Sequence, residues 1–287
     1  MGIQPKKVAK SFALDVLRLS HAITPDFVAR RILRVMRIGF QPPSDAIEYP
    51  EGARAACCIS IDFDATRPGR LRANHQGTEA LVDLAEEYEV PITWAICGKT
   101  AEEDLEAYRM IVDSDAKGEI AIHTYSHVDV SRCSSDELEG EIEKWKIALG
   151  LDTCPKTFIF PWNRAAHFDT LKRLGFIAYR GADRIIGTPI NHNGLWNVPP
   201  VYYVGDHSFN AWALIRRFID FCITYSSVFH LWLHPWIGDN VVTNGGCKEF
   251  VKKTVEPVFE YLGEKKDAND IAVCPLGQLA EWFEKRS

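Results

Sequence analysis

The sequence predicts an α/β protein whose parallel strands close into a barrel preceded by a helical hairpin. From residue 53 to residue 287, short apolar segments alternate with amphipathic ones, a pattern typical of a parallel sheet covered by helices. The 287 residues suit one barrel, which commonly takes roughly 200 to 250 residues, plus a short extension. Two further amphipathic segments come first. We therefore expect a helical extension and linker over residues 1–52 and a barrel domain over residues 53–287.

The hairpin is predicted by periodic apolar residues over 6–20 and 25–38. Thr24 is a suitable N-cap, and Pro25 suits the first helical position. Lysines and arginines line the polar faces, which suits contact of residues 1–40 with a membrane surface. Packing of the hairpin against its own domain explains the same pattern and is favoured. Residues 41–52 are rich in turn formers and are expected to be a linker.

Within the barrel, apolar runs predict strands and periodic apolar positions predict helices. The expected strands lie at 55–63, 92–98, 119–124, 157–161 and 176–181, around 195–203 and 228–234, and at 271–275. The expected helices lie at 77–90, 102–114, 134–150 and 165–176, around 209–222 and 247–262, and at 276–286. Ser134 and Glu137 form a capping box, and Gly150 ends that helix. In parallel barrels the chemistry lies at the carboxyl ends of the strands.

Composition narrows the class of protein. The net charge of -6 provides no clustered basic face for nucleic acid, so no nucleic-acid partner is expected. The eight cysteines form no C-x-x-C pair, and several lie in apolar runs, which favours a reducing compartment. The start of the chain lacks the apolar run of a signal peptide, and no segment is long enough to span a membrane. We therefore predict a cytoplasmic protein.

Three groups of polar residues follow predicted strands. Asp62 and Asp64 end the first strand on the same face, where two adjacent carboxylates repel unless a cation or proton lies between them. His123 and His127 follow the third strand with a spacing that suits a shared metal. His234 ends the late strand and faces the same end of the barrel. Taken singly, each group also fits solvated acids or structural histidines; together they predict a metal site.

The order S-I-D-F-D, H-T-Y-S-H, F-P-W-N, Trp196 and L-W-L-H resembles the polysaccharide deacetylase family over about residues 53–275. The resemblance implies a distorted (β/α) barrel with fewer than eight units. It implies that Asp64, His123 and His127 bind a divalent metal, most often Zn²⁺, with Co²⁺, Ni²⁺ or Fe²⁺ as alternatives. It also implies that Asp62 is the general base and His234 the general acid, and that a backbone N–H near Trp162 helps to hold the oxyanion.

Two positions depart from the family pattern. The third motif usually has an arginine where this chain has Ile159, and Arg164 is a candidate replacement. The fourth motif usually has an aspartate beside Trp196 that orients the acid histidine; Asp183 or Asp206 are candidates here. The predicted substrate-binding residues are Pro161, Trp162, Arg164, Trp196 and Trp232, because aromatic faces suit sugar rings, although a buried tryptophan is more often part of a core.

The expected function is metal-dependent removal of an N-acyl group, acetyl first, from an amino sugar or glycan. One alternative is a deformylase or amidase that acts on a formamido sugar or on a non-sugar amide such as a cyclic imide. Another is a non-catalytic, metal-stabilised carbohydrate-binding protein, which the presence of both Asp62 and His234 disfavours. The sequence leaves the acyl group, the sugar, the metal and the oligomeric state open.

Overall fold

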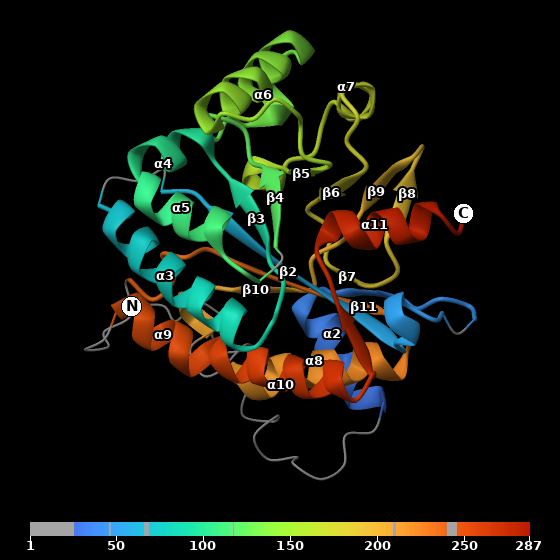
Figure 1. Cartoon of the computed structure of the whole chain (residues 1–287). Coiled ribbons are helices and arrows are strands. Elements are labelled where there is room, and N and C mark those ends of the chain that lie inside the picture. Colours follow the sequence, from blue (N-terminus) through green and yellow to red (C-terminus); the bar gives the residue numbers. More distant parts are fainter. Residues whose placement is uncertain (1–25, 46, 66–68, 117, 209–210, 240–245) are drawn as a thin grey trace, which may run out of the picture.

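A single curled sheet forms the centre of the molecule (Figure 1). The computed structural model describes residues 26–45, 47–65, 69–116, 118–208, 211–239 and 246–287. The sheet has the order β1-β7-β11-β2-β3-β4-β5-β6-β9-β8, with β10 paired to β11 and β12 paired to β2. Its strands are β1 Gly39–Gln41, β2 Ala55–Phe63, β3 Thr93–Ile96, β4 Glu119–Ile122, β5 Thr157–Ile159, β6 Ala178–Arg180, β7 Ile185–Gly187, β8 Ile190–His192, β9 Leu195–Asn197, β10 Tyr202–Val204, β11 Val228–Leu233 and β12 Ile271–Val273.

β2 is the central strand, and it is buried at every residue. It pairs in parallel with β3, β11 and β12, so segments from the middle and from the far end of the sequence meet on one strand. Parallel pairing continues through β3, β4, β5 and β6. A parallel sheet buried on both sides requires continuous apolar strands, and AACCISIDF in β2 meets this requirement up to its acidic end. The predicted distorted barrel is confirmed.

Helices surround the curled sheet (Figure 1). They are α2 Asp26–Met36, α3 Leu71–Glu87, α4 Gly98–Glu103, α5 Leu105–Asp113, α6 Ser135–Leu149, α7 Phe168–Arg173, α8 Trp212–Thr224, α9 Gly246–Thr254, α10 Glu256–Asp267 and α11 Leu276–Glu284. The predicted capping box of α6 is confirmed, and Gly150 ends this helix with a φ of +64°. The helix predicted over 247–262 is divided at Val255 into α9 and α10, and Pro257 lies in the first turn of α10.

The N-terminal extension differs in part from the prediction. Its first helix, predicted over 6–20, lies outside the described residues, and the second corresponds to α2. Residues 39–41 form β1, which pairs in parallel with β7. Gly39 approaches the backbone of Arg184 closely enough to donate a hydrogen bond of 2.7 Å, which explains how the chain joins the sheet there. The extension therefore contributes a strand to the sheet of the barrel.

The amino ends of the strands are closed by α11. The carboxylate of Glu119, at the start of β4, accepts hydrogen bonds from the hydroxyls of Thr93 and Thr157. The backbone N–H of Gly277 in α11 donates to the same carboxylate over 3.0 Å. A Cβ at Gly277 would overlap Glu119, so only glycine allows this close approach. We call this layer, Thr93, Glu119, Thr157 and Gly277, the floor of the barrel.

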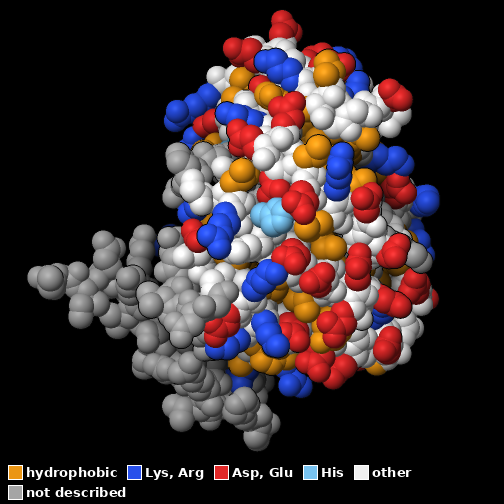
Figure 2. Space-filling view, turned by 60° about the vertical axis from the view of Figure 1, so that its left-hand side comes forward, with side chains coloured by type: hydrophobic (Ala, Val, Ile, Leu, Met, Phe, Trp, Pro, Cys, Tyr) orange, Lys and Arg blue, Asp and Glu red, His pale blue; other side chains and the backbone are white. Residues whose placement is uncertain are grey.

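The surface has no dominant charge on the face shown in Figure 2, where basic and acidic side chains are interspersed. Hydrophobic side chains lie between them in small groups (Figure 2). Among the residues that the structure describes, no helix has both the length and the apolar character needed to cross a bilayer.

Candidate active site

Asp62 and Asp64 lie side by side at the carboxyl end of β2. The two residues are 3% and 4% exposed, and both side chains face the interior of the barrel. The interior positions beside Asp62 on the next strands are Ala95 and Ala121, which cluster with Ile159. Two buried carboxylates in apolar surroundings need cationic partners to remain ionised. Three other parts of the chain provide histidine or arginine side chains that lie close to these carboxylates.

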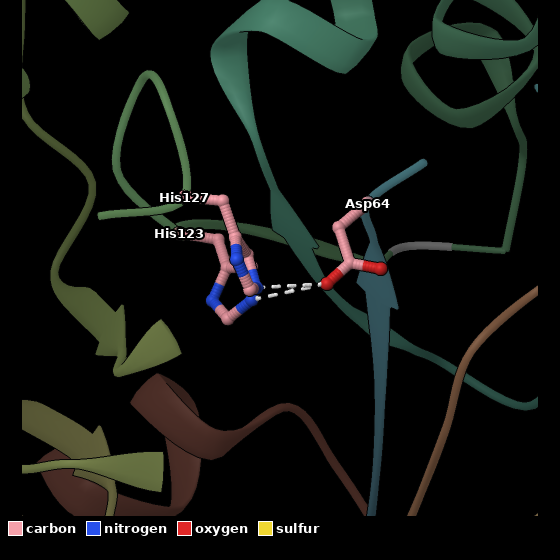
Figure 3. Close-up of side chains that lie close together, drawn as sticks. All are labelled: Asp64, His123 and His127. Atoms are coloured by element: carbon pink, nitrogen blue, oxygen red, sulfur yellow. Dashed lines mark ion pairs between the residues drawn. The ribbon is translucent and has the colours of Figure 1, made fainter. Parts of the chain in front are cut away.

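His123 and His127 provide the first of them (Figure 3). His123 directly follows β4, and the loop then turns through positive φ angles at Thr124 and His127, which brings both rings to the same carboxylate. The Nε2 atom of His127 lies 2.9 Å from Oδ2 of Asp64, and that of His123 lies 3.8 Å from the same oxygen. Burial raises the pKa of Asp64, but the neighbouring His234, His123 and His127 outweigh it and lower the pKa well below its usual range.

The donor atoms of Asp64, His123 and His127 all lie within 4.8 Å of one another. Nδ1 of His123 donates to the carbonyl oxygen of Ile159 over 2.7 Å, which leaves Nε2 with its lone pair. This Nε2 is buried and has no hydrogen-bond partner within the described residues. One carboxylate and two imidazoles with an unused buried lone pair fit a divalent metal of the zinc class. These three residues are the ones that would hold it, as the sequence predicts.

Arg180, from β6, provides the second cationic partner. Its Nη1 and Nη2 atoms donate to Oδ1 and Oδ2 of Asp62 over 2.7 and 2.6 Å, a bidentate pair. Burial alone would raise the pKa of Asp62, but Arg180, with His123 and His234, lowers it below its usual value. Arg180 is in register with Ile159 on β5, so the charge missing from the third motif comes from the neighbouring strand.

Arg164 does not take this role. It forms an ion pair with Asp129 on the surface, with half of its side chain exposed. The candidate replacement named from the sequence is therefore wrong, because the turn Pro161–Asn163 and the extended backbone of Arg164 direct this side chain to the loop after β4. A role of Arg164 in substrate binding stays a prediction.

His234 provides the third partner, just beyond β11. Its Nε2 lies 3.8 Å from Oδ2 of both Asp62 and Asp64, so it faces the same small space. Its Nδ1 lies 3.4 Å from the hydroxyl of Tyr203 on β10. Burial lowers the pKa of His234, against the two carboxylates, which raise it. The side chain found at Nδ1 is thus a tyrosine. Neither of the aspartates suggested by the sequence is seen there.

The two aspartates lie elsewhere. Asp206 accepts a hydrogen bond of 2.8 Å from the backbone of Gly238, and Asp183 is exposed. Tyr203 reaches His234 because β10 pairs in parallel with β11, which puts Tyr203 opposite Trp232. The sequence carries no motif for this contact, since it depends on which strand lies beside β11.

Two tryptophans fix the residues of the site. Trp236 donates its indole N–H to the backbone oxygen of Asp64 over 2.7 Å and to its Oδ1 over 3.0 Å. Its ring stacks on His234 with centroids 4.3 Å apart. Trp232 lies under the guanidinium of Arg180, 4.4 Å from its carbon atom. Both rings therefore hold residues of the site in place. Neither contact was predicted, and the substrate-binding role of Trp232 stays a prediction.

The predicted substrate-binding aromatics have different surroundings. Trp162 is 58% exposed, and its ring centroid is 5.1 Å from that of His127, at the edge of the site. It follows the buried Pro161 and has a φ of +59°. Trp196 is only 6% exposed, and its indole donates to Glu284 of α11 over 2.7 Å. The core position of Trp196 suits packing, and its predicted contact with substrate stays a prediction.

Residues 52–170 match the family model described as polysaccharide deacetylase. A solved structure of a protein from Mycobacterium smegmatis named as a polysaccharide deacetylase has a TM-score of 0.66 and 20% identity, covering 85% of this chain and 95% of that one. A second protein so named, from Pseudomonas aeruginosa PAO1, has a TM-score of 0.60 and 14% identity, covering 85% and 98%. An allantoinase has a TM-score of 0.62 and 12% identity, covering 85% and 98%.

These solved structures cover 85% of this chain, so the likeness in fold extends beyond the residues that the family model matches. Arg180, Tyr203 and His234 lie beyond residue 170, and their part in the site rests on the distances given above. The two motifs with the metal-ligand spacing, Asp62–Asp64 and His123–His127, lie within the matched residues. The resemblance that these motifs predict is confirmed over residues 52–170, where the chain matches the family model.

Proposed function

We propose that this protein is a metal-dependent hydrolase that removes an N-acyl group, acetyl first, from an amino sugar or glycan. The observation that carries the proposal is the convergence of Asp62 and His234 on Asp64, the shared carboxylate of the candidate metal ligands. A base and an acid on the two sides of a Lewis acid are what hydrolysis of an amide requires. The family match of residues 52–170 supports this chemistry.

When bound, a divalent metal supplies a water of lowered pKa and polarises the acyl carbonyl. Asp62 then accepts the proton of the attacking water. It is suited to this because Arg180 holds both of its oxygens and keeps it ionised. His127 and His123 keep the metal-binding carboxylate of Asp64 oriented, and Trp236 holds it from the other side.

The amine leaves only after it gains a proton. His234 Nε2 faces the space between the carboxylates, so this nitrogen delivers the proton, while Tyr203 holds Nδ1. The proton that Asp62 accepts and the proton that His234 donates balance over the reaction. Trp162 offers an exposed aromatic face beside His127 on which a sugar ring can lie.

The identity of the metal, the location of the protein and its contact with membranes complete the proposal. Zinc is the first candidate metal, with cobalt, nickel and iron as alternatives. A cytoplasmic location is supported by the eight cysteines, all free among the described contacts. Membrane contact through residues 1–40 stays a prediction, since residues 1–25 lie outside the described part.

A non-sugar amide is the second candidate substrate. One of the similar structures is an allantoinase, so cyclic amides and formamido sugars belong in any substrate panel beside N-acetylated sugars. A non-catalytic binding protein is disfavoured, because binding alone gives no reason to hold the buried carboxylate of Asp62 and the imidazole of His234 next to the candidate metal ligands.

The test combines metal analysis with acyl release. We expect about one divalent ion per chain in the wild type, and release of acetate or formate from at least one member of the panel. Asp62→Asn should retain the ion and lose activity by about a hundredfold or more, since it removes a general base. A wild type that binds no zinc, cobalt, nickel or iron and releases no acyl group would contradict the proposal.

A further inference from the structure

A buried polar pair lies one layer deeper in the barrel than Asp62. Ser60 precedes Asp62 by two residues on β2, and His230 precedes His234 by four on the neighbouring strand β11. Both are fully buried, with 0% of each side chain exposed. Ser60 opens the S-I-D-F-D motif but was given no role there, and His230 lies outside the motifs of the sequence analysis. Neither residue belongs to the group of candidate metal ligands. A buried serine and histidine need hydrogen-bond partners, and the partners of these two residues indicate their role.

The hydrogen bonds of this pair run in one direction only. His230 Nδ1 lies 3.0 Å from the carbonyl oxygen of Val198, which can only accept, so Nδ1 carries the proton. Nε2 of His230 must then accept, and it lies 2.8 Å from the Ser60 hydroxyl, which donates to it. The Ser60 oxygen in turn accepts from Nη1 of Arg180 over 2.9 Å. The chain of contacts ends at Asp62 through the bidentate pair.

His230 remains uncharged in this position. Burial, and after it the charge of Arg180, lowers its pKa to about 3. It therefore holds Ser60 as a neutral acceptor at any pH at which the protein works. Among the contacts described, Arg180 is then the only cation of this layer that binds Asp62. No second positive charge among the described residues of the layer competes with it for the carboxylate.

Ser60 restricts the rotation of the Arg180 guanidinium in its plane. Arg180 Nε has no hydrogen-bond partner within the described residues. The Trp232 ring attracts the guanidinium through a cation–π contact, which does not fix the rotation of the guanidinium in its plane. The contact of Nη2 with Asn163 is long, at 3.4 Å. Among the described residues, the Ser60 oxygen is thus the one short side-chain acceptor besides Asp62 that fixes the rotation of the guanidinium in its plane.

We propose that Ser60 and His230 are positioning residues that act through Arg180 to hold the carboxylate of Asp62 at the angle its reaction needs. The proposal rests on the proposed function, in that Asp62 is taken as the general base. It assigns the pair no contact with substrate. It predicts that loss of Ser60 lowers kcat, leaves KM and metal content unchanged, and has this effect only while Arg180 is present.

Thr93 is a matched control for Ser60. The two residues are in register on adjacent strands, and both are fully buried. The Thr93 hydroxyl, however, donates to Glu119 in the floor, over 3.0 Å. Thr93→Val therefore removes a buried hydroxyl of the same depth without touching Arg180. A loss of activity that follows from weakened packing would appear in both variants.

The kinetic experiment uses Ser60→Ala and Thr93→Val, each in the wild type and in an Arg180→Lys background. Since a hydrogen bond to a charged group is lost, we expect Ser60→Ala to lower kcat about tenfold and Thr93→Val by less than about twofold. In the Arg180→Lys background Ser60→Ala should lower kcat by less than about twofold, since coupled residues are not additive. An equal loss from Thr93→Val, or the same Ser60→Ala factor in both backgrounds, overturns the proposal.

His230 is tested with two amides. Gln can place its oxygen near the position of Nε2 and keep an acceptor for Ser60, whereas Asn is too short to reach it. We expect His230→Gln to retain most of kcat and His230→Asn to match the loss in Ser60→Ala. If both amides lower kcat equally, the acceptor at Nε2 is not what matters and the role assigned to His230 fails.

A measurement without substrate separates this proposal from the proposed function. In ¹⁵N NMR spectra, the terminal N–H groups of a guanidinium fixed at both nitrogens exchange slowly with water. We expect such signals for Arg180 in the wild type and in Thr93→Val, and at least about tenfold faster exchange in Ser60→Ala, matching the loss of one hydrogen bond to a charged group. Unchanged exchange in Ser60→Ala overturns the positioning role, even if the wild type hydrolyses amides. Faster exchange in a protein that releases no acyl group keeps the positioning role, while the proposed function fails.

Discussion

The two ends of the barrel each bury a carboxylate, but they surround it in opposite ways. In the floor, Glu119 receives hydrogen bonds from neutral groups only, two threonine hydroxyls and the Gly277 N–H. Burial raises the pKa of Glu119, and these hydrogen bonds only partly oppose it. At the other end, Asp62 and Asp64 face an arginine and three histidines, and their pKa values are lowered despite deeper burial.

The difference shows what separates a structural carboxylate from a chemical one in the same fold. Neutral donors satisfy the oxygens of Glu119 and close the space around it with α11. Arg180 and the histidines lower the pKa values of Asp62 and Asp64, and the lone pair on Nε2 of His123 stays unused, so this end can take up a cation. Depth of burial alone does not distinguish the two ends; the charge of the neighbours does.

The largest effect is expected from Asp64→Ala. It removes the carboxylate that both histidines face, so metal content should fall to background. Loss of the Lewis acid should lower kcat/KM by at least about a thousandfold, since such an ion contributes several kcal/mol to the barrier. Metal analysis and acyl release measure both. A variant that keeps its metal would show that the charged end does not bind a cation through Asp64.

The second effect is expected from Arg180→Met, which removes the charge beside Asp62. An unpaired buried carboxylate should lower the free energy of unfolding at pH 7 by about 3 kcal/mol. In the wild type the lowered pKa means that Asp62 contributes stability above its unfolded pKa and loses it as the pH falls through the folded value. In the variant this sign reverses.

The deficit of Arg180→Met should therefore shrink as the pH is lowered to about 4, where Asp62 of the variant takes up a proton. Urea denaturation at several pH values measures it, with Arg173→Met, a surface ion pair with Glu139, as control. A deficit that does not depend on pH would mean that Arg180 contributes packing rather than charge.

A smaller effect is expected from Trp162→Ala at the open end. The exposed ring lies beside His127 and offers its face to a substrate. Its loss should raise KM about tenfold with little change in kcat, in line with the energy of a single aromatic contact. Trp282→Ala on α11, which stacks on Tyr49, is the control for loss of an aromatic ring. Equal effects of the two variants would remove Trp162 from the substrate site.

The smallest effect is expected from Glu119→Gln in the floor. The amide can accept from Thr93 and Gly277 and donate to Thr157, so activity should stay within about twofold, consistent with a residue outside the reaction. A carboxyl whose folded pKa is raised stabilises the fold at low pH and loses this contribution as the pH rises through that pKa. Relative to the wild type, the variant should therefore gain stability with rising pH. A large loss of activity would mean that the floor takes part in the chemistry.

The sequence predicts the candidate metal ligands of the charged end because they lie at or soon after the end of a strand and their spacing is local. Asp62 and Asp64 share a face of one strand, and His123 and His127 share one loop. The fold is predicted on the same basis: β2 is observed over the nine residues expected. The capping box of α6 likewise depends on neighbours three residues apart.

Arg180 and Tyr203 are missed because they depend on register between strands that are distant in the sequence. Arg180 lies beside Asp62 only because β6 is in register with β5 and the sheet curls. A charged residue at the end of an apolar strand, A-Y-R, was the available signal, since arginine is seldom fully buried unless paired. The pairing of β1 with β7 could not be predicted from the sequence for the same reason.

The position of β2 in the sheet also sets an order on synthesis. Ala55 and its neighbours leave the ribosome early, but β2 pairs with β11 and β12, and Ile271 is the residue opposite Ala55. Pairing between residues so distant in sequence is slow. Until β11 and β12 have been synthesised, the apolar strand β2 therefore lacks these partners and keeps one edge exposed. During translation, the acidic end of this strand would meet His234 only after β11 is in place, because His234 lies just beyond that strand. A ribosome-bound chain stalled before β11 should therefore remain susceptible to proteolysis and to capture by chaperones.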